Sequence, residues 1–141
     1  MLEAKALTRH YRVRRGLFAG AATLRALDGV SVSLQPGKTL AVVGESGCGK
    51  TTLAKMMLGL LPPTTGEILL DGIPINSVSV LDIAKKVQPV FQDPYSSLNP
   101  RKTIEAIISL PLKVHDIGTP ESRRARVEEY MRLVGLPKRL I

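Results

Sequence analysis

The chain has 141 residues, a length typical of one domain, and 44% of them are hydrophobic. With one cysteine and no apolar run of about 18 residues, the composition excludes a disulfide-stapled scaffold and a transmembrane helix. The net charge of +8 lies at the two ends: residues 1–25 hold six basic residues and one acidic, and residues 120–141 hold six basic and three acidic. These ends could form a surface for nucleic acid, anionic lipid or a polyanionic nucleotide, but we favour two solvated basic faces because no nucleic-acid motif accompanies them.

Hydrophobic patterning predicts mostly strands in the first third of the chain. The expected elements are a strand over 4–11, a loop over 14–23, a strand over 26–34 and a turn at Pro36-Gly37. A continuous β-prone run over 39–43 predicts a further strand, buried on both faces. A glycine-rich loop, 44–49, follows, and a helix is predicted from Lys50 to Leu60 with an apolar stripe of Leu53, Met56, Met57 and Leu60.

The remaining two thirds alternate strand, loop and helix, which predicts an α/β fold. The expected elements are a strand over 67–70 closed by an Asp71-Gly72 turn, a helix over 80–86, a strand over 87–91 with an unpaired position at Pro89, a polar loop over 93–100 and a helix over 103–110 ended by Pro111. The last helix is expected to begin at Thr119-Pro120 and to run to Val134, with Gly135 as its C-cap. Its predicted apolar stripe is Val127, Tyr130, Met131 and Val134.

One segment carries a chemical signature. Residues 44–51, Gly-Glu-Ser-Gly-Cys-Gly-Lys-Thr, fit G-x-x-x-x-G-K-[ST] at every fixed position, between a predicted strand and a predicted helix. The glycines let backbone N–H groups converge on one anion, and the helix N-terminus adds its own N–H groups and positive dipole end. Lys50 would supply a charge to the β- and γ-phosphates, and the Thr51 hydroxyl would be a ligand of Mg²⁺. We therefore predict a polyphosphate-binding loop, called the phosphate loop below.

Three stretches of the sequence resemble the ATP-binding subunits of ABC transporters, in particular those of dipeptide and oligopeptide importers. They are Ala26–Ser31 with Gly37–Val43, Gly44–Thr52, and Val90–Arg101. The resemblance implies an α/β, P-loop NTPase-like fold with an antiparallel β-subdomain and the start of an α-helical subdomain. It divides the chain into residues 1–92, with the β-subdomain and phosphate loop, and residues 93–141, with the Q-loop and the beginning of the helical subdomain.

The resemblance also implies roles for single residues. Gln92 matches the Q-loop glutamine, which in the family reaches Mg²⁺ and the attacking water. Tyr11 lies in a stretch similar to the A-loop, whose aromatic ring stacks on adenine; the alternative is a partly buried tyrosine of the first strand. Lys50 and Gln92 are thus expected as catalytic residues, and Thr51 and Gln92 as metal ligands. The residues expected to bind ATP are Tyr11, Gly44, Ser46, Gly47, Cys48, Gly49, Lys50, Thr51 and Thr52.

Several parts of the family's pattern do not occur after residue 92. The sequence has no apolar strand ending in Asp-Glu, no Leu-Ser-Gly-Gly-Gln segment and no histidine in the switch context. We therefore expect an incomplete domain that binds ATP and Mg²⁺ without efficient turnover, and an unpaired apolar edge on 39–43.

For the complete protein, the resemblance implies ATP hydrolysis coupled to import of peptides or similar solutes, at the cytoplasmic face of the membrane. The implied partners are permease subunits, a second ATP-binding subunit and, indirectly, a solute-binding protein; Tyr95, Leu98 and Arg101 are candidate permease contacts. The alternatives are another P-loop NTPase or kinase, a non-enzymatic nucleotide- or nucleic-acid-binding module, and an ABC ATPase outside transport. We do not expect nucleic acid as a partner.

Overall fold

The computed structural model describes residues 1–14, 21–93, 95, 97–137 and 139, and the chain divides into two compact units, Met1–Pro89 and Val90–Ile141. Within the described residues, no helix is both long and apolar enough to cross a membrane.

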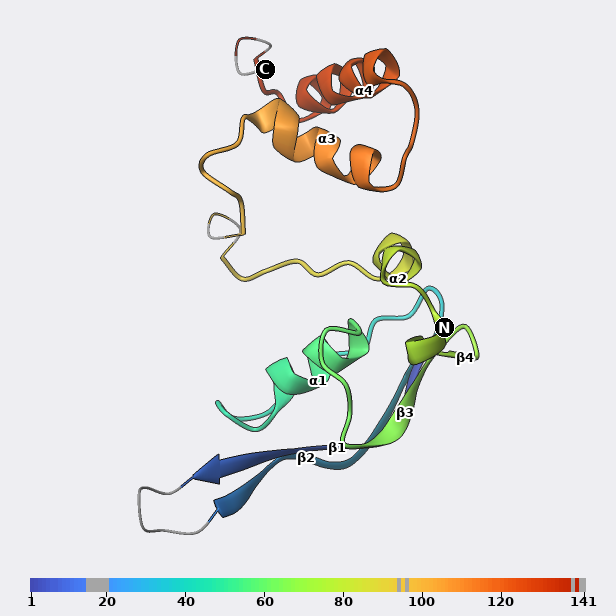
Figure 1. Cartoon of the computed structure of the whole chain (residues 1–141), viewed down its shortest axis with the longest axis vertical. Helices are drawn as coiled ribbons and strands as arrows, with labels where there is room; N and C mark the ends of the chain where they lie inside the picture. The colour runs from blue at the N-terminus through green and yellow to red at the C-terminus, as the bar shows by residue number, and fades with distance from the viewer. Residues whose placement is uncertain (15–20, 94, 96, 138, 140–141) are drawn as a thin grey trace. The chain divides into compact units, whose positions relative to one another are not determined.

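A four-stranded antiparallel sheet is the frame of the first unit (Figure 1). Its strands are β1 (Leu2–Arg14), β2 (Ala21–Leu34), β3 (Thr65–Leu70) and β4 (Ile73–Pro74), in the order β2-β1-β3-β4. The predicted antiparallel strands are confirmed, and β2 also takes in residues 21–23, which were expected in a loop. The part of that loop at 15–20 lies outside the described residues. Asp71 and Gly72 join β3 to β4 with φ values of 53° and 80°, as a type I′ turn requires.

Helix α1 (Lys50–Met57) places Leu53 and Met56 in the hydrophobic core with residues of the sheet. The helix ends at Met57 and not at Leu60, because Gly59 adopts a φ of 71°. The amides of Gly59 and Leu60 turn back to the carbonyls of Met56 and Lys55, which is the Schellman pattern. Leu60 is therefore 66% exposed and does not belong to the apolar stripe.

A 3₁₀ turn, η1 (Ile75–Ser77), and helix α2 (Val80–Lys86) complete the first unit. The hydroxyl of Ser79 accepts a hydrogen bond from the amide of Asp82, so a side chain caps α2 at its N-terminus. Ile75 and Ile83 join the core. The helix predicted over 80–86 is confirmed.

Two predicted strands do not form. In the described part of the chain, residues 39–43 and 87–91 pair with no strand. Val43 is 91% exposed and Val90 98% exposed, where burial on both faces was expected for the first segment. A strand buried on both faces needs a hydrogen-bonding neighbour and packing on each side, and the antiparallel sheet described here supplies neither. At 87–91 the whole segment is unpaired, and not Pro89 alone.

The second unit contains two helices, α3 (Ile104–Val114) and α4 (Pro120–Leu133). The hydroxyls of Thr103 and Thr119 cap them at their N-termini. Pro111 lies inside α3 and does not end it, contrary to the prediction. The helix continues because proline removes only one donor; it ends where Asp116 adopts a φ of 51° and the Ile117 amide bonds to the carbonyl of Leu112.

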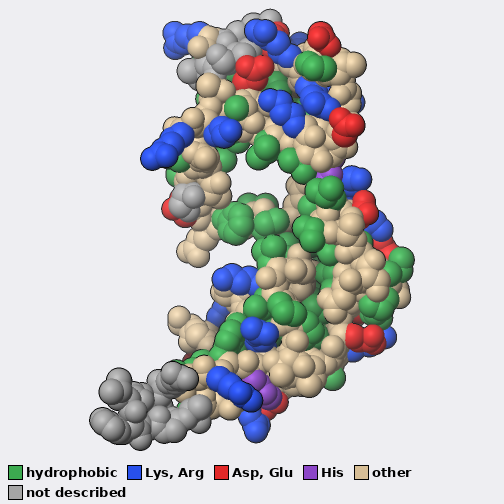
Figure 2. Space-filling model, in the orientation of Figure 1, with side chains coloured by type: hydrophobic (Ala, Val, Ile, Leu, Met, Phe, Trp, Pro, Cys, Tyr) green, Lys and Arg blue, Asp and Glu red, His purple; other side chains and the backbone are tan. Residues whose placement is uncertain are grey.

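Helix α4 follows the prediction at its two ends but only partly along its stripe. Gly135 follows the helix with a φ of 76°, as expected of a C-terminal glycine. Val127 and Met131 are buried, whereas Tyr130 and Val134 are exposed, so only two of the four residues of the predicted stripe are buried. Figure 2 shows Lys and Arg side chains of this unit interspersed with acidic ones, which is the arrangement of a solvated face.

Candidate functional site

The phosphate loop is held against a bulge in β2. Arg9 of β1 pairs with Leu27 and His10 pairs with Arg25, so Ala26 is the extra residue of a β-bulge. Gly49 adopts a φ of 99°, and a Cβ atom there would lie 2.4 Å from the carbonyl oxygen of Ala26. Only glycine fits this close approach of two backbones.

The other two motif glycines differ in what surrounds them. Gly47 adopts a φ of 82° with open space around its Cα. Gly44 has an ordinary φ, but a Cβ atom there would lie 2.6 Å from Sγ of Cys48. Gly44 is thus favoured by a close contact, Gly47 by its backbone conformation and Gly49 by both.

Helix α1 begins without a side-chain cap. Among the described residues, no side chain accepts a hydrogen bond from its first amides, and its N-cap is Gly49. Helices α2, α3 and α4 each have a Ser or Thr hydroxyl in that role. The first N–H groups of a helix lack intrahelical partners, so those of α1 stay available to an anion.

The ammonium group of Lys50 lies within the loop itself. Its Nζ donates to the carbonyl oxygens of Gly44 at 2.7 Å and Glu45 at 2.6 Å, and lies 3.6 Å from Sγ of Cys48. The loop's own carbonyls thus hold the positive charge at its centre, where phosphate oxygens would form stronger, charge-assisted hydrogen bonds with it.

A cavity of about 380 Å³ is lined by the phosphate loop, the start of α1 and strands β1 and β2. Its lining residues are Tyr11, Leu24, Ala26, Ser46, Gly47, Gly49, Lys50, Thr51 and Thr52. The structure thus brings Tyr11, predicted from a different part of the sequence, to the same hollow as the phosphate loop. One aromatic platform, one cation and a helix N-terminus then share one site, as a nucleotide needs for its base and its phosphates.

Sequence reasoning missed three contributors to this site. Leu24 and Ala26 line the cavity from β2, and Arg9 lies over the Tyr11 ring, with its Cζ 4.7 Å from the ring centroid. A signal for Arg9 was present, because residues two apart on a strand share a face. No local signal marks Leu24 or Ala26, since their position depends on the pairing of β2 with β1.

Gln92 belongs to the second unit, where it is exposed, and its expected role stays a prediction. Tyr95, Leu98 and Arg101 are exposed in the same unit. Their expected role as permease contacts is likewise untested by the structure.

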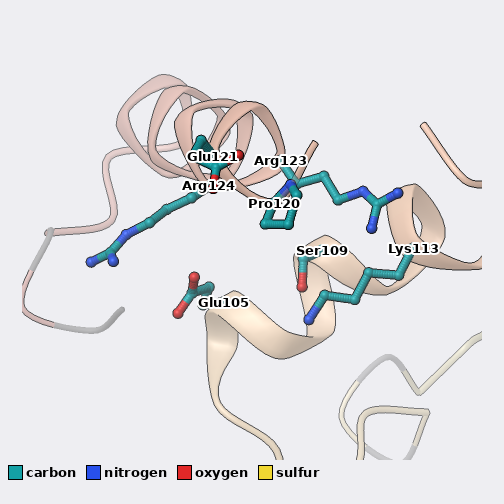
Figure 3. A pocket seen from close by; sticks show the side chains of 7 residues that line it. All are labelled: Glu105, Ser109, Lys113, Pro120, Glu121, Arg123 and Arg124. Atoms are coloured by element: carbon teal, nitrogen blue, oxygen red, sulfur yellow. The ribbon is translucent and has the colours of Figure 1, made fainter. Parts of the chain in front are cut away.

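A second cavity, of about 390 Å³, lies between α3 and α4 (Figure 3). Its lining residues are Glu105, Ser109, Lys113, Pro120, Glu121, Arg123 and Arg124. The Arg123 guanidinium already donates to the carbonyl of Ile117 and to Asp116. The backbone N–H of Glu121 and the Thr119 hydroxyl lower the pKa of the Glu121 carboxyl. These charges are engaged within the unit, and the cavity contains none of the predicted site residues.

Comparisons with known proteins match most of the chain. The model of a family described as ABC transporter matches residues 27–141. Over 139 residues the chain is 48% identical to the di/tripeptide transport ATP-binding protein DppF of Pseudomonas aeruginosa, covering 96% of this chain and 43% of that protein. It is 43% identical to the oligopeptide transport ATP-binding protein AppF of Bacillus subtilis, with coverage of 96% and 43%. The chain therefore spans less than half the length of these two relatives.

Solved structures resemble the fold as well. The ATP-binding cassette MJ0796, a dimer bound to ADP and Pi, matches with a TM-score of 0.76 at 28% identity, covering 99% of this chain and 60% of that one. CbiO1 from Clostridium perfringens, part of the transporter complex CbiONQ, matches with a TM-score of 0.67 at 27% identity, with coverage of 99% and 51%.

Proposed function

The chain belongs to the ABC transporter family, and on that premise we propose that it binds ATP with Mg²⁺ in the cavity between Tyr11 and the phosphate loop. The observation that carries the proposal is the shared cavity itself. Tyr11 comes from β1 and the loop lies more than thirty residues later in the sequence, yet both line one hollow of about 380 Å³. A single ligand with a base at the Tyr11 end and a polyphosphate at the loop end would occupy this cavity.

The phosphate end offers positive charge and free donors. Lys50 supplies an ammonium group, and the uncapped N-terminus of α1 supplies backbone N–H groups. On binding, Lys50 would exchange its bonds to the carbonyls of Gly44 and Glu45 for bonds to phosphate oxygens. Gly47 and Gly49 allow the backbone to curve around the anion.

A magnesium ion fits the same end of the cavity. The Thr51 side chain belongs to an exposed residue in the first turn of α1 and lines the cavity beside Lys50. One protein hydroxyl suffices as an anchor, because Mg²⁺ keeps several waters and takes its other ligands from phosphates. When bound, the ion neutralises phosphate charge. We propose Thr51 as the residue of this cavity that would hold the ion.

At the level of the complete protein, we propose that this site hydrolyses ATP to drive import of peptides. Support comes from relatives described as di/tripeptide and oligopeptide transport ATP-binding proteins. A relative from Escherichia coli, 41% identical, is described as part of a putrescine export system, so the solute is the least constrained part of the proposal. The proposed partners are permease subunits and a second ATP-binding subunit, with a solute-binding protein indirectly, at the cytoplasmic face of the membrane.

The test is calorimetric titration of the chain with ATP in the presence and absence of Mg²⁺. We expect Lys50→Ala to weaken Mg-ATP binding by about tenfold or more, the scale of a hydrogen bond to a charged group. Lys55→Ala is the matched control, because Lys55 is exposed in the last turn of the same helix and does not line the cavity. Equal losses for the two variants would reject the site.

Two variants of Thr51 test the proposed magnesium ligand. Thr51→Ala should weaken ATP binding only when Mg²⁺ is present, because it removes the proposed ligand oxygen. Thr51→Ser keeps that oxygen and should bind Mg-ATP like the unchanged chain. A similar loss in both variants would mean that the hydroxyl does not hold the metal.

A further inference from the structure

Arg9 and Tyr11 form a stacked pair beside the nucleotide cavity. The Arg9 Cζ lies 4.7 Å from the centroid of the Tyr11 ring, well within the range of a cation–π contact. Tyr11 is among the described residues that line the cavity, and Arg9 is not. The guanidinium therefore contacts the ring without itself lining the cavity.

The guanidinium is itself held in place. Arg9 Nη1 donates to the carbonyl oxygen of Pro62 at 2.9 Å, in the segment that follows α1. Its Nε is buried and, within the described part of the chain, has no hydrogen-bond partner. The hydrogen bond anchors one end of the guanidinium, and a cation partly withdrawn from water interacts more strongly with an aromatic face than an exposed one.

We propose that Arg9 is a positioning residue for the base-binding platform. Arg9 holds the Tyr11 ring in the orientation that an adenine base stacks on, so the base does not have to order the ring when it binds. It also links the platform to the chain after α1, the helix whose opposite end carries the phosphate loop. The inference rests on the proposed ATP site and adds the residue that sets its preference for a ligand with a base.

The expected effect follows from the cost of ordering one aromatic side chain and losing one cation–π contact, about three- to tenfold in affinity. It applies to ligands that have a base. A tripolyphosphate contacts the loop but cannot stack on Tyr11, so its affinity should not depend on Arg9. The ratio of ATP affinity to tripolyphosphate affinity therefore isolates positioning from general damage to the fold or the loss of a positive charge.

The experiment measures this ratio on the full 141-residue chain for Arg9→Ala, Tyr11→Ala and the double variant. We expect Arg9→Ala to lower the ratio about three- to tenfold with tripolyphosphate binding unchanged. In the Tyr11→Ala background, the same change should have no further effect on the ratio. Arg12→Ala removes the same charge from an exposed neighbouring position of β1 and should leave the ratio unchanged. If Arg9→Ala does not fold, Arg9→Gln replaces it, because Gln keeps part of the stem and lacks the cation.

The outcomes separate the inference from the proposed function. Arg9 variants that weaken ATP and tripolyphosphate binding equally, or that still lower the ratio when Tyr11 is absent, would overturn the positioning role. An unchanged ratio together with a normal Lys50 dependence would overturn it as well, and would leave the ATP site intact. If Lys50→Ala does not change Mg-ATP binding, the proposed function fails and the inference fails with it.

Discussion

The contact between Gly49 and the bulge at Ala26 can be tested by adding a single methyl group. In Gly49→Ala the new Cβ would lie 2.4 Å from the Ala26 carbonyl oxygen and 3.1 Å from Cδ2 of Leu27. The first atom belongs to the backbone of β2 and cannot rotate away. Gly47→Ala is the matched control, because Gly47 has a similar positive φ of 82° and open space around it.

The two variants share one cost and differ in another. A left-handed conformation costs an L residue about 1–2 kcal/mol, and alanine recovers part of this by restricting the unfolded chain. Gly47→Ala should therefore lower the free energy of unfolding by about 1 kcal/mol. Gly49→Ala adds the overlap with β2, and overpacking of this kind typically costs about 1–3 kcal/mol more. We expect a total near 2–4 kcal/mol for Gly49→Ala.

Urea unfolding followed by far-UV circular dichroism, with a shared m-value, measures the difference. Calorimetric titration with Mg-ATP should in parallel show a larger loss for Gly49→Ala, because displacing the loop from β2 displaces Lys50 and the start of α1. If the unfolding free energies of the two variants agree within about 0.5 kcal/mol, the close contact with Ala26 does not constrain the loop and the reasoning is wrong.

Two further predictions concern charge and reactivity. Hydrogen bonds from Lys86 and the N-terminal amine lower the pKa of Asp71 from 3.8 to about 2, so Asp71 contributes stability that is complete above pH 3.8 and is lost as the pH falls towards 2. Asparagine tolerates the same φ, so Asp71→Asn should fold. In urea titrations over that pH window, its free energy of unfolding should fall less than that of the unchanged chain. Equal falls would exclude Asp71 as the cause. Cys48 is exposed 3.6 Å from Lys50 Nζ, so alkylation should block Mg-ATP binding and Cys48→Ser should bind ATP and resist the reagent; unchanged affinity of the alkylated chain would contradict this.

Much of the candidate site could be predicted from the sequence, because its signals are local. The spacing of Gly44, Gly49 and Lys50 predicts a phosphate loop, and the structure shows the helix start predicted at Lys50. Thr119 and Pro120 predict the start of α4 correctly, because a helix cap depends on residues within one turn.

The predictions that failed concern elements whose formation depends on contacts between distant residues. The sequence of 39–43 is apolar and β-prone, yet it forms no strand among the described residues, since a strand exists only with a partner. Pro111 was expected to end α3, but a proline removes one donor and the helix continues to the left-handed residue Asp116.

Sequence alone predicts the phosphate loop, because glycine spacing, a lysine and a helix start act within a few residues of one another. Which residues lie around that loop depends on the three-dimensional fold. The antiparallel register of β1 and β2 brings Tyr11 to the cavity, the bulge at Ala26 seats the loop, and Arg9 reaches the Tyr11 ring while bonded to Pro62. The strand pairing, the bulge contact and the bond from Arg9 to Pro62 join residues far apart in the chain, and the free energy that selects them comes from packing and pairing of the whole unit, which local propensity does not contain.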